Sequence, residues 1–146
     1  MKTASVSRYL IAVIACGIFI PMTKAADKPA ASDVEKIQGT WLLISGERGG
    51  KALPPEITKN ITLVFAGDKL TTKNKDRKTE ATFKLDATRK PKEIDIDMEG
   101  SVGRGIYQLD GDNLKIAHGE VGGPRPTEFP KELSGLTVLV LKREKP

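Results

Sequence analysis

Few residues of this 146-residue chain are of the types that carry out covalent or metal chemistry. The chain has one histidine, His118, and one cysteine, Cys16, and only four serines follow residue 26. A serine or cysteine nucleophile needs a base beside it, and a zinc ion takes three or four histidine, cysteine or carboxylate ligands. There is no nucleophile-elbow pattern, and no glycine-rich phosphate loop precedes a helix. We therefore predict that the protein is not an enzyme and uses no metal or cofactor.

A second set of polar and aromatic residues has the chemistry of a ligand-binding site. Arg125, Glu128 and Phe129 lie in a long segment, residues 119–135, that contains three prolines. Loops longer than about 12–15 residues are usually functional or disordered, and proline stiffens the path of the chain. The alternative is structural: Phe129 plugs the mouth of a barrel, and Arg125 pairs with Glu128 or with a neighbouring strand. Further candidates for polar contacts with a ligand are Arg104, Tyr107 and His118.

The elements that must position these residues are strands. Ile94, Ile96 and Met98 alternate with Asp95 and Asp97, a pattern that predicts an inward apolar face and an outward acidic face. No segment after residue 38 has a convincing helical repeat. The eight strands that we predict are residues 40–45, 61–66, 69–72, 79–85, 94–98, 105–109, 114–117 and 136–142.

Tight turns predict how these strands are connected. Gly67-Asp68 and the run Asp110-Gly111-Asp112-Asn113 are hairpin signals between successive strands. Eight short strands joined in this way favour an all-β fold, an eight-stranded antiparallel up-and-down barrel, because closure removes exposed strand edges. A two-sheet sandwich is the alternative. We expect a short helix before the barrel, since Ser32 and Glu35 fit a capping box and Gly39 ends the segment.

In an up-and-down barrel, alternate connections share one end. The connections at the end that holds Trp41 are short, whereas the opposite end has two long ones, residues 47–60 and 119–135. We therefore expect one closed end and one open mouth, and an eight-stranded barrel can hold one small ligand. Residues 73–78 form a basic tip at the same open end. Either it is a solvated hairpin tip, or it attracts an anionic ligand or surface.

The first 26 residues have the layout of a secretory signal peptide. Lys2 and Arg8 precede an apolar run from Tyr9 to Ile20, and small residues follow at the expected cleavage site. The run is too short to span a bilayer. A lipid anchor at Cys16 is the alternative. We therefore divide the chain into a signal peptide (1–26), a flexible leader (27–32) and one domain (33–146), which is exported to the periplasm or outside the cell.

The start of the first strand resembles a known signature. Gly39-Thr40-Trp41 is similar to the Gly-x-Trp motif of the lipocalins and their calycin relatives, including the intracellular fatty-acid binders. In those families a basic residue near the end of the chain packs over the tryptophan, which implies this structural role for Arg143. The first strand starts and the eighth ends at the same rim of such a barrel, where arginine stacks favourably on an indole ring. Leu139 and Leu141 depart from the family, because fatty-acid binders often carry there an arginine and a tyrosine that hold the ligand carboxylate.

The domain as a whole more closely resembles a family of small secreted domains of unknown function, abundant in planctomycete bacteria and placed near the lipocalins. The family has no established activity, so the resemblance implies a fold and export but no reaction. It commonly has a cysteine and an aromatic residue where this chain has Ala117-His118. The matching runs are 39–41, 45–48, 50–54, 65–69, 83–86, 90–95, 104–107, 110–112, 114–116, Arg125-Pro126-Thr127-Glu128-Phe129 and 138–143.

Two functions fit these observations. The first is a non-catalytic module that binds one small apolar or amphipathic molecule inside the barrel. The second is a filled barrel that acts through its surface, as an envelope protein-interaction or inhibitor module. We expect a monomer without a membrane span, and the removal of three basic residues with the signal weakens any case for a nucleic-acid partner. The interior volume separates the two functions, because the barrel could be filled by Trp41, Phe65, Phe83, Met98 and Tyr107.

Overall fold

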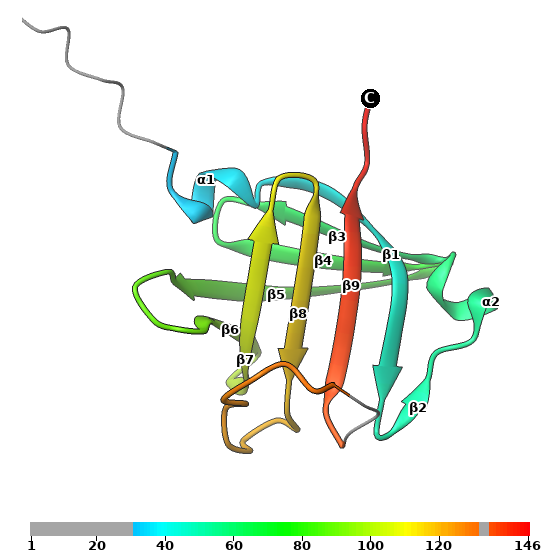
Figure 1. Ribbon diagram of the computed structural model, residues 1–146. Coiled ribbons are helices and arrows are strands. Elements are labelled where there is room, and N and C mark those ends of the chain that lie inside the picture. Colours follow the sequence, from blue (N-terminus) through cyan, green and yellow to red (C-terminus); the bar gives the residue numbers. More distant parts are fainter. Residues whose placement is uncertain (1–30, 132–134) are drawn as a thin grey trace, which may run out of the picture.

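The computed structural model describes residues 31–131 and 135–146, shown in Figure 1. The predicted signal peptide and residues 27–30 of the predicted leader lie outside the described residues. The helices in the described part are α1 (Asp33–Lys36) and α2 (Pro55–Thr58). The strands in the described part are β1 (Gly39–Arg48), β2 (Lys51–Ala52), β3 (Ile61–Ala66), β4 (Lys69–Asn74), β5 (Arg77–Asp86), β6 (Lys92–Met98), β7 (Ser101–Asp110), β8 (Asn113–His118) and β9 (Thr137–Arg143).

The strands form a closed antiparallel barrel. Each strand from β3 to β9 pairs with the next along the chain, and β1 pairs with both β3 and β9. This confirms the all-β prediction and the eight-stranded up-and-down order, and it excludes the two-sheet sandwich. β2 and α2 were not predicted. β2 is only two residues long and pairs with the end of β1, outside the eight-stranded ring.

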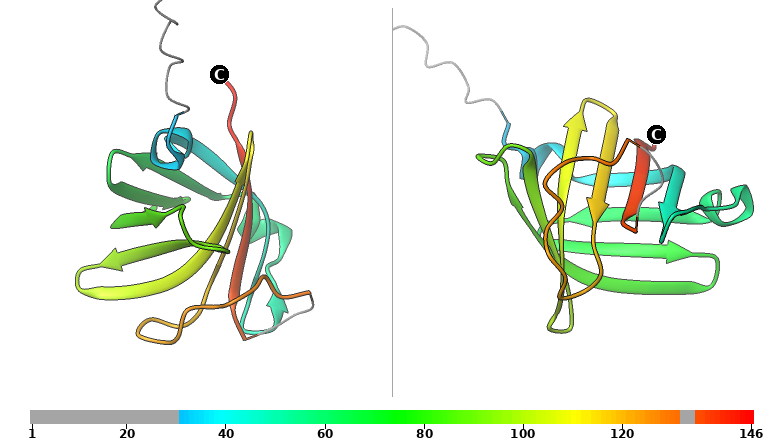
Figure 2. Two further views of the ribbon diagram at one scale, coloured as in Figure 1. Left: turned by 60° about the vertical axis from the view of Figure 1, so that its left-hand side comes forward. Right: turned by 60° about the horizontal axis from the view of Figure 1, so that its bottom comes forward.

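The barrel is flattened into two walls whose strands run in crossing directions (Figures 1 and 2). β7, β8 and β9 run side by side in the wall nearest the viewer in Figure 1, and β3, β4 and β5 run across behind them. β1 bends from one wall to the other. The bend coincides with a β-bulge in β1. Leu43 pairs with Leu141 of β9 and Ser45 pairs with the next residue of β9, Val140, so that Ile44 is the extra residue.

Alternation along the strands builds the core. On β6, Ile94 is fully buried and Ile96 packs against the core, as the alternating sequence predicts. The aromatic rings of Phe65 and Phe83 meet edge to face, with centroids 4.9 Å apart. These rings lie with Trp41 in one continuous apolar cluster. Burial of this apolar cluster is the main favourable term in folding. The chain has a single cysteine, Cys16, so no disulfide within the chain adds to it.

The closed end is built around Trp41 and Arg143. Trp41 is fully buried, and its indole Nε1 donates a hydrogen bond to the carbonyl oxygen of Ile37, 2.8 Å away. The guanidinium carbon of Arg143 lies 4.3 Å from the centroid of the indole ring. Arg143 also donates to the carbonyls of Lys36 and Gln38, at the end of α1. One arginine therefore joins the last strand, the first strand and the helix that covers this end.

Gly39 makes room for this arrangement. Its φ of +117° lies in the region that favours glycine, and a Cβ atom there would come 3.1 Å from an Arg143 guanidinium nitrogen. The next connection is closed by Gln38, whose side-chain amide exchanges two hydrogen bonds with the backbone of Gly67 at 2.7 and 3.0 Å. The sequence around Trp41 thus fits both the helix and the turn between β3 and β4.

The long connection between β8 and β9 lies on the outer face of the barrel. Its described part, residues 119–131, passes across the outer side of β7 and β8 (Figure 2). Ile106, Ala117 and Val138 form a second small core there, against which Phe129 and Leu136 pack. The loop is therefore an external strap, and the open mouth is bordered by the other connections and by the first residues of this loop.

Candidate ligand-binding site

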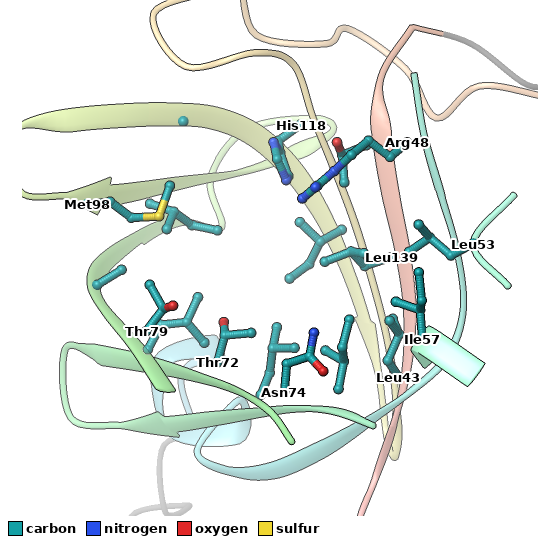
Figure 3. A pocket seen from close by; sticks show the side chains of 18 of the residues that line it. Leu43, Arg48, Leu53, Ile57, Thr72, Asn74, Thr79, Met98, His118 and Leu139 are labelled. Carbon is teal, nitrogen blue, oxygen red and sulfur yellow. The ribbon is translucent and has the colours of Figure 1, made fainter. Parts of the chain in front are cut away.

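The open half of the barrel contains a cavity of about 490 Å³ (Figure 3). This volume lies within the range of 300–1,000 Å³ that is typical of small-molecule sites. Most of the lining is aliphatic. The apolar residues that line it are Leu43, Leu53, Ile57, Ile61, Leu63, Leu70, Ala81, Ile96, Met98, Ile116, Val121 and Leu139.

The cavity is deep and opens to solvent at one end. Leu63, Leu70 and Ile116 line its inner part and are almost completely buried. Ile57, from α2, and Val121, from the loop after β8, line its outer part and are exposed. The long connection 47–60 thus supplies part of the mouth through α2, a helix that begins with a proline at its first turn.

The cavity exists because inward positions in the open half carry small side chains. Gly103 lines the cavity on β7, where a Cβ atom would find its nearest neighbour, the carbonyl oxygen of Ile96, at 3.7 Å. Ala81, Thr72 and Thr79 face the same space from β4 and β5. The closed half instead holds the aromatic side chains. The interior is therefore filled at one end and empty at the other.

The mouth has a polar and basic border. Arg48 and His118 point into one side of the cavity, as Figure 3 shows, and Asn74 and Arg77 line it from β4 and β5. His118 Nδ1 lies 2.8 Å from the carbonyl oxygen of Gly119. Because a carbonyl can only accept, this contact assigns the proton to Nδ1 and leaves Nε2 as the nitrogen available to a ligand.

The bulge in β1 decides which charge faces the cavity. Strict alternation from Trp41 and Leu43 would send Glu47 inward. The extra residue at Ile44 and Ser45 reverses the alternation, so that Arg48 lines the cavity. β-bulges commonly redirect side chains in this way.

The structure separates the six residues predicted to bind a ligand. His118 lines the cavity. Tyr107 is buried at the closed end, where its hydroxyl donates to an Asp33 carboxylate oxygen 2.8 Å away. Arg104 is exposed on β7 between two inward glycines, so it faces the outside of the barrel. Arg125, Glu128 and Phe129 belong to the external strap, and none of them lines the cavity.

The partners of Arg125 lie on the wall of the barrel. Its guanidinium pairs with Glu93 at 3.4 Å and with Asp95 at 2.8 Å, and it donates to the carbonyl oxygens of Ile94 and Gly105. The alternative, pairing with a neighbouring strand, is therefore the observed one. The outward carboxylates of β6 hold the strap against the barrel.

Phe129 lies on the outer face of the barrel and does not plug its mouth. Its ring packs against the outer core, and the Lys115 ammonium lies 5.0 Å from the ring centroid. The segment reaches this position because Ile106 and Ala117 leave an apolar surface on the outer face of β7 and β8. A strand that is apolar on both faces signals a cover, and this signal is present in the run Gly105-Ile106-Tyr107.

Asp33 is a largely buried carboxylate at the closed end. The Asp33 side chain is only 10% exposed, and Lys92 Nζ lies 2.6 Å from its carboxylate. Burial alone would raise the pKa of Asp33, but the hydrogen bonds from Lys92 and Tyr107, with the charges of Lys92 and Lys36, outweigh it and hold the pKa below its ordinary value. Burial and the adjacent Asp33 carboxylate raise the pKa of Tyr107 well above its ordinary value. This cluster fastens α1 to β6 and β7.

Among the described residues, no three histidine, cysteine, aspartate or glutamate side chains are grouped so that they could hold a metal ion. No helix in residues 31–131 or 135–146 is both long and apolar enough to cross a membrane. Comparisons with protein-family models, with curated proteins and with solved structures give no match to this chain. The resemblance to the lipocalins and to the planctomycete family therefore stays a prediction.

Proposed function

We propose that this protein is an exported, non-catalytic binding protein of lipocalin-like design that holds one small apolar or amphipathic molecule in the open half of its barrel. The observation that carries this proposal is the unfilled apolar cavity of about 490 Å³. Trp41 beneath Arg143 at the closed end supports the lipocalin-like design, and the layout of residues 1–26 supports export.

Binding of an apolar molecule in this cavity should be favourable in free energy. Leu63, Leu70 and Ile116 offer the ligand a wall from which water can be displaced. Removal of apolar surface from water is worth roughly 25 cal/mol per Å². Burial of about 300 Å² would contribute about 7.5 kcal/mol before the costs of association, less than the roughly 8 kcal/mol of a micromolar dissociation constant. We therefore expect apolar burial alone to give affinities weaker than micromolar.

A variant that fills the cavity tests this function. Gly103→Leu places an apolar side chain in the cavity, where a Cβ atom meets nothing closer than 3.7 Å. Purified protein is titrated with an environment-sensitive dye, which is then displaced by a panel of fatty acids and terpenoids. We expect saturable binding to the wild type and at least tenfold weaker binding to Gly103→Leu.

The control adds a leucine where there is no cavity. Ala66→Leu changes an exposed residue at the end of β3, beside the closed-end turn, and should bind as the wild type does. The thermal midpoints of both variants should stay close to that of the wild type. If no member of the panel binds, or if Gly103→Leu binds normally, the cavity is not a ligand site and surface interaction becomes the better account.

A further inference from the structure

The charges around the cavity are of one sign. Arg48 and Arg77 line it together with His118. Of the described residues that line the cavity, none is acidic. The low dielectric of the apolar wall strengthens the field of the two arginines at the mouth.

The strand register brings Arg48 and His118 together at the mouth. His118 pairs with Thr137 of β9, and the next residue of β9, Val138, pairs with Glu47 of β1. Arg48 follows Glu47 and therefore lies beside Thr137 from the other side. Neighbouring strands are about 4.8 Å apart, so the backbones of Arg48 and His118 are about 10 Å apart. Their side chains, both in the cavity lining, converge on the space between them (Figure 3).

The two arginines at the mouth are free to bind a ligand, unlike others in the molecule. Arg125 is occupied by Glu93 and Asp95, and Arg143 by Asp112. In residues 31–131 and 135–146, neither Arg48 nor Arg77 forms an ion pair. An arginine without a protein partner at a cavity mouth can offer its planar fork of donors to an anionic group of a ligand.

We infer that the mouth selects a ligand with an anionic head group, so that the ligand class is a single-chain anionic amphiphile such as a carboxylate with an apolar tail. This inference rests on the proposed function. The head group lies between the guanidinium groups of Arg48 and Arg77, and the tail extends towards Leu70. A cationic head group would meet only like charge there, and a neutral one would leave the guanidinium groups in water.

A matched series of head groups tests the inference. Dodecanoate, dodecyl sulfate, 1-dodecanol and dodecyltrimethylammonium share one tail length and are titrated below their micelle concentrations, at pH 7.5 and low ionic strength. We expect the two anions to bind the wild type about tenfold more tightly than the alcohol, and the cation to bind most weakly. The preference should shrink in 0.5 M salt, because exposed charges are screened.

Variants identify the groups responsible. The double variant Arg48→Met and Arg77→Met keeps the apolar stems and removes both charges, and we expect the ratio between dodecanoate and dodecanol to fall to about one. Arg104→Met is the control, since Arg104 is exposed on β7 and does not line the cavity; it should keep the wild-type ratio. Thermal midpoints establish that each variant is folded.

The outcomes separate this inference from the function on which it rests. Equal affinity of the wild type for dodecanoate and dodecanol, or an undiminished ratio in the double variant, would overturn the anionic selection and leave the cavity as a binding site. Binding of none of the four amphiphiles would contradict the proposed function itself. The series on the wild type decides the matter even if a variant does not fold.

Discussion

Asp33 shows how single residues hold the closed end together. Its carboxylate accepts from Lys92 on β6 and from Tyr107 on β7, and its own backbone belongs to α1. Burial opposes the charge, but the two donors and the nearby lysines hold the pKa of Asp33 below its ordinary value. The charged form therefore stabilises the folded state.

Asp33→Asn should reduce stability in a pH-dependent way. At pH 7, Asp33 is ionised in the folded and unfolded chains, so its contribution is fully present. That contribution is lost as the pH falls through the ordinary value near 3.9 and then through the lower folded pKa. We expect urea unfolding to give a wild-type advantage of about 1–2 kcal/mol at pH 7, and a smaller advantage at pH 3.

The control for this comparison is Asp76→Asn, in the exposed hairpin tip between β4 and β5. It should not change the free energy of unfolding at either pH. A wild-type advantage over Asp33→Asn that is the same at pH 7 and pH 3 would show that the Asp33 charge does not stabilise the fold.

At the same scale, Arg48 could not have been assigned to the cavity from the sequence. Counting in twos from Trp41 places Glu47 inside, and the bulge that reverses this count is a tertiary feature of the pairing with β9. His118 was a candidate from its residue type alone, and the basic tip, which ends near Arg77, was noted from its charge. The sequence thus predicted two parts of the mouth, but not the side chain that completes its basic side.

Among the elements, the strap after β8 departs furthest from expectation. Its length and its prolines predicted a loop that frames the mouth. The apolar outer face of β7 and β8 instead holds residues 119–131 against the side of the barrel, through Phe129 and the ion pairs of Arg125. A loop's length indicates that it has something to cover, but not which face it covers.

Phe129→Ala should therefore weaken the fold without affecting the ligand site. Phe129 is half-buried, so we expect a loss of about 1–2 kcal/mol in the free energy of unfolding, less than the 3–5 kcal/mol of a fully buried phenylalanine. Affinity for the dye and its competitors should be unchanged. A marked loss of affinity in a folded Phe129→Ala protein would return the strap to the mouth.

The two glycines of β7 serve different purposes at the element scale. β7 pairs regularly with β6 through both Gly103 and Gly105. A Cβ atom at Gly105 would lie 2.7 Å from the Ala117 carbonyl oxygen, whereas Gly103 has room. One glycine permits close strand approach, and the other leaves volume to the cavity.

For the whole molecule, local signals were sufficient for the barrel and insufficient for its contents. Alternation and tight turns are read within a few residues, and they predicted eight strands and a closed end. Cavity volume depends on the sizes of the inward side chains at each end of the barrel. The rings of Phe65 and Phe83 meet at one end, whereas the small residues Thr72 and Gly103 line the cavity at the other. The cavity volume therefore follows from the register of all eight strands, which no short segment of the sequence specifies.

The central claim, that the open half of the barrel is a ligand site, is tested most directly by a crystal structure of the protein with 12-bromododecanoate. The bromine marks the end of the tail through its anomalous scattering. We predict one strong bromine peak in the inner part of the cavity, between Leu63, Leu70 and Ile116, with the carboxylate near Arg48 and Arg77. A cavity closed by its own side chains, or bromine found only on the outer surface, would contradict the account.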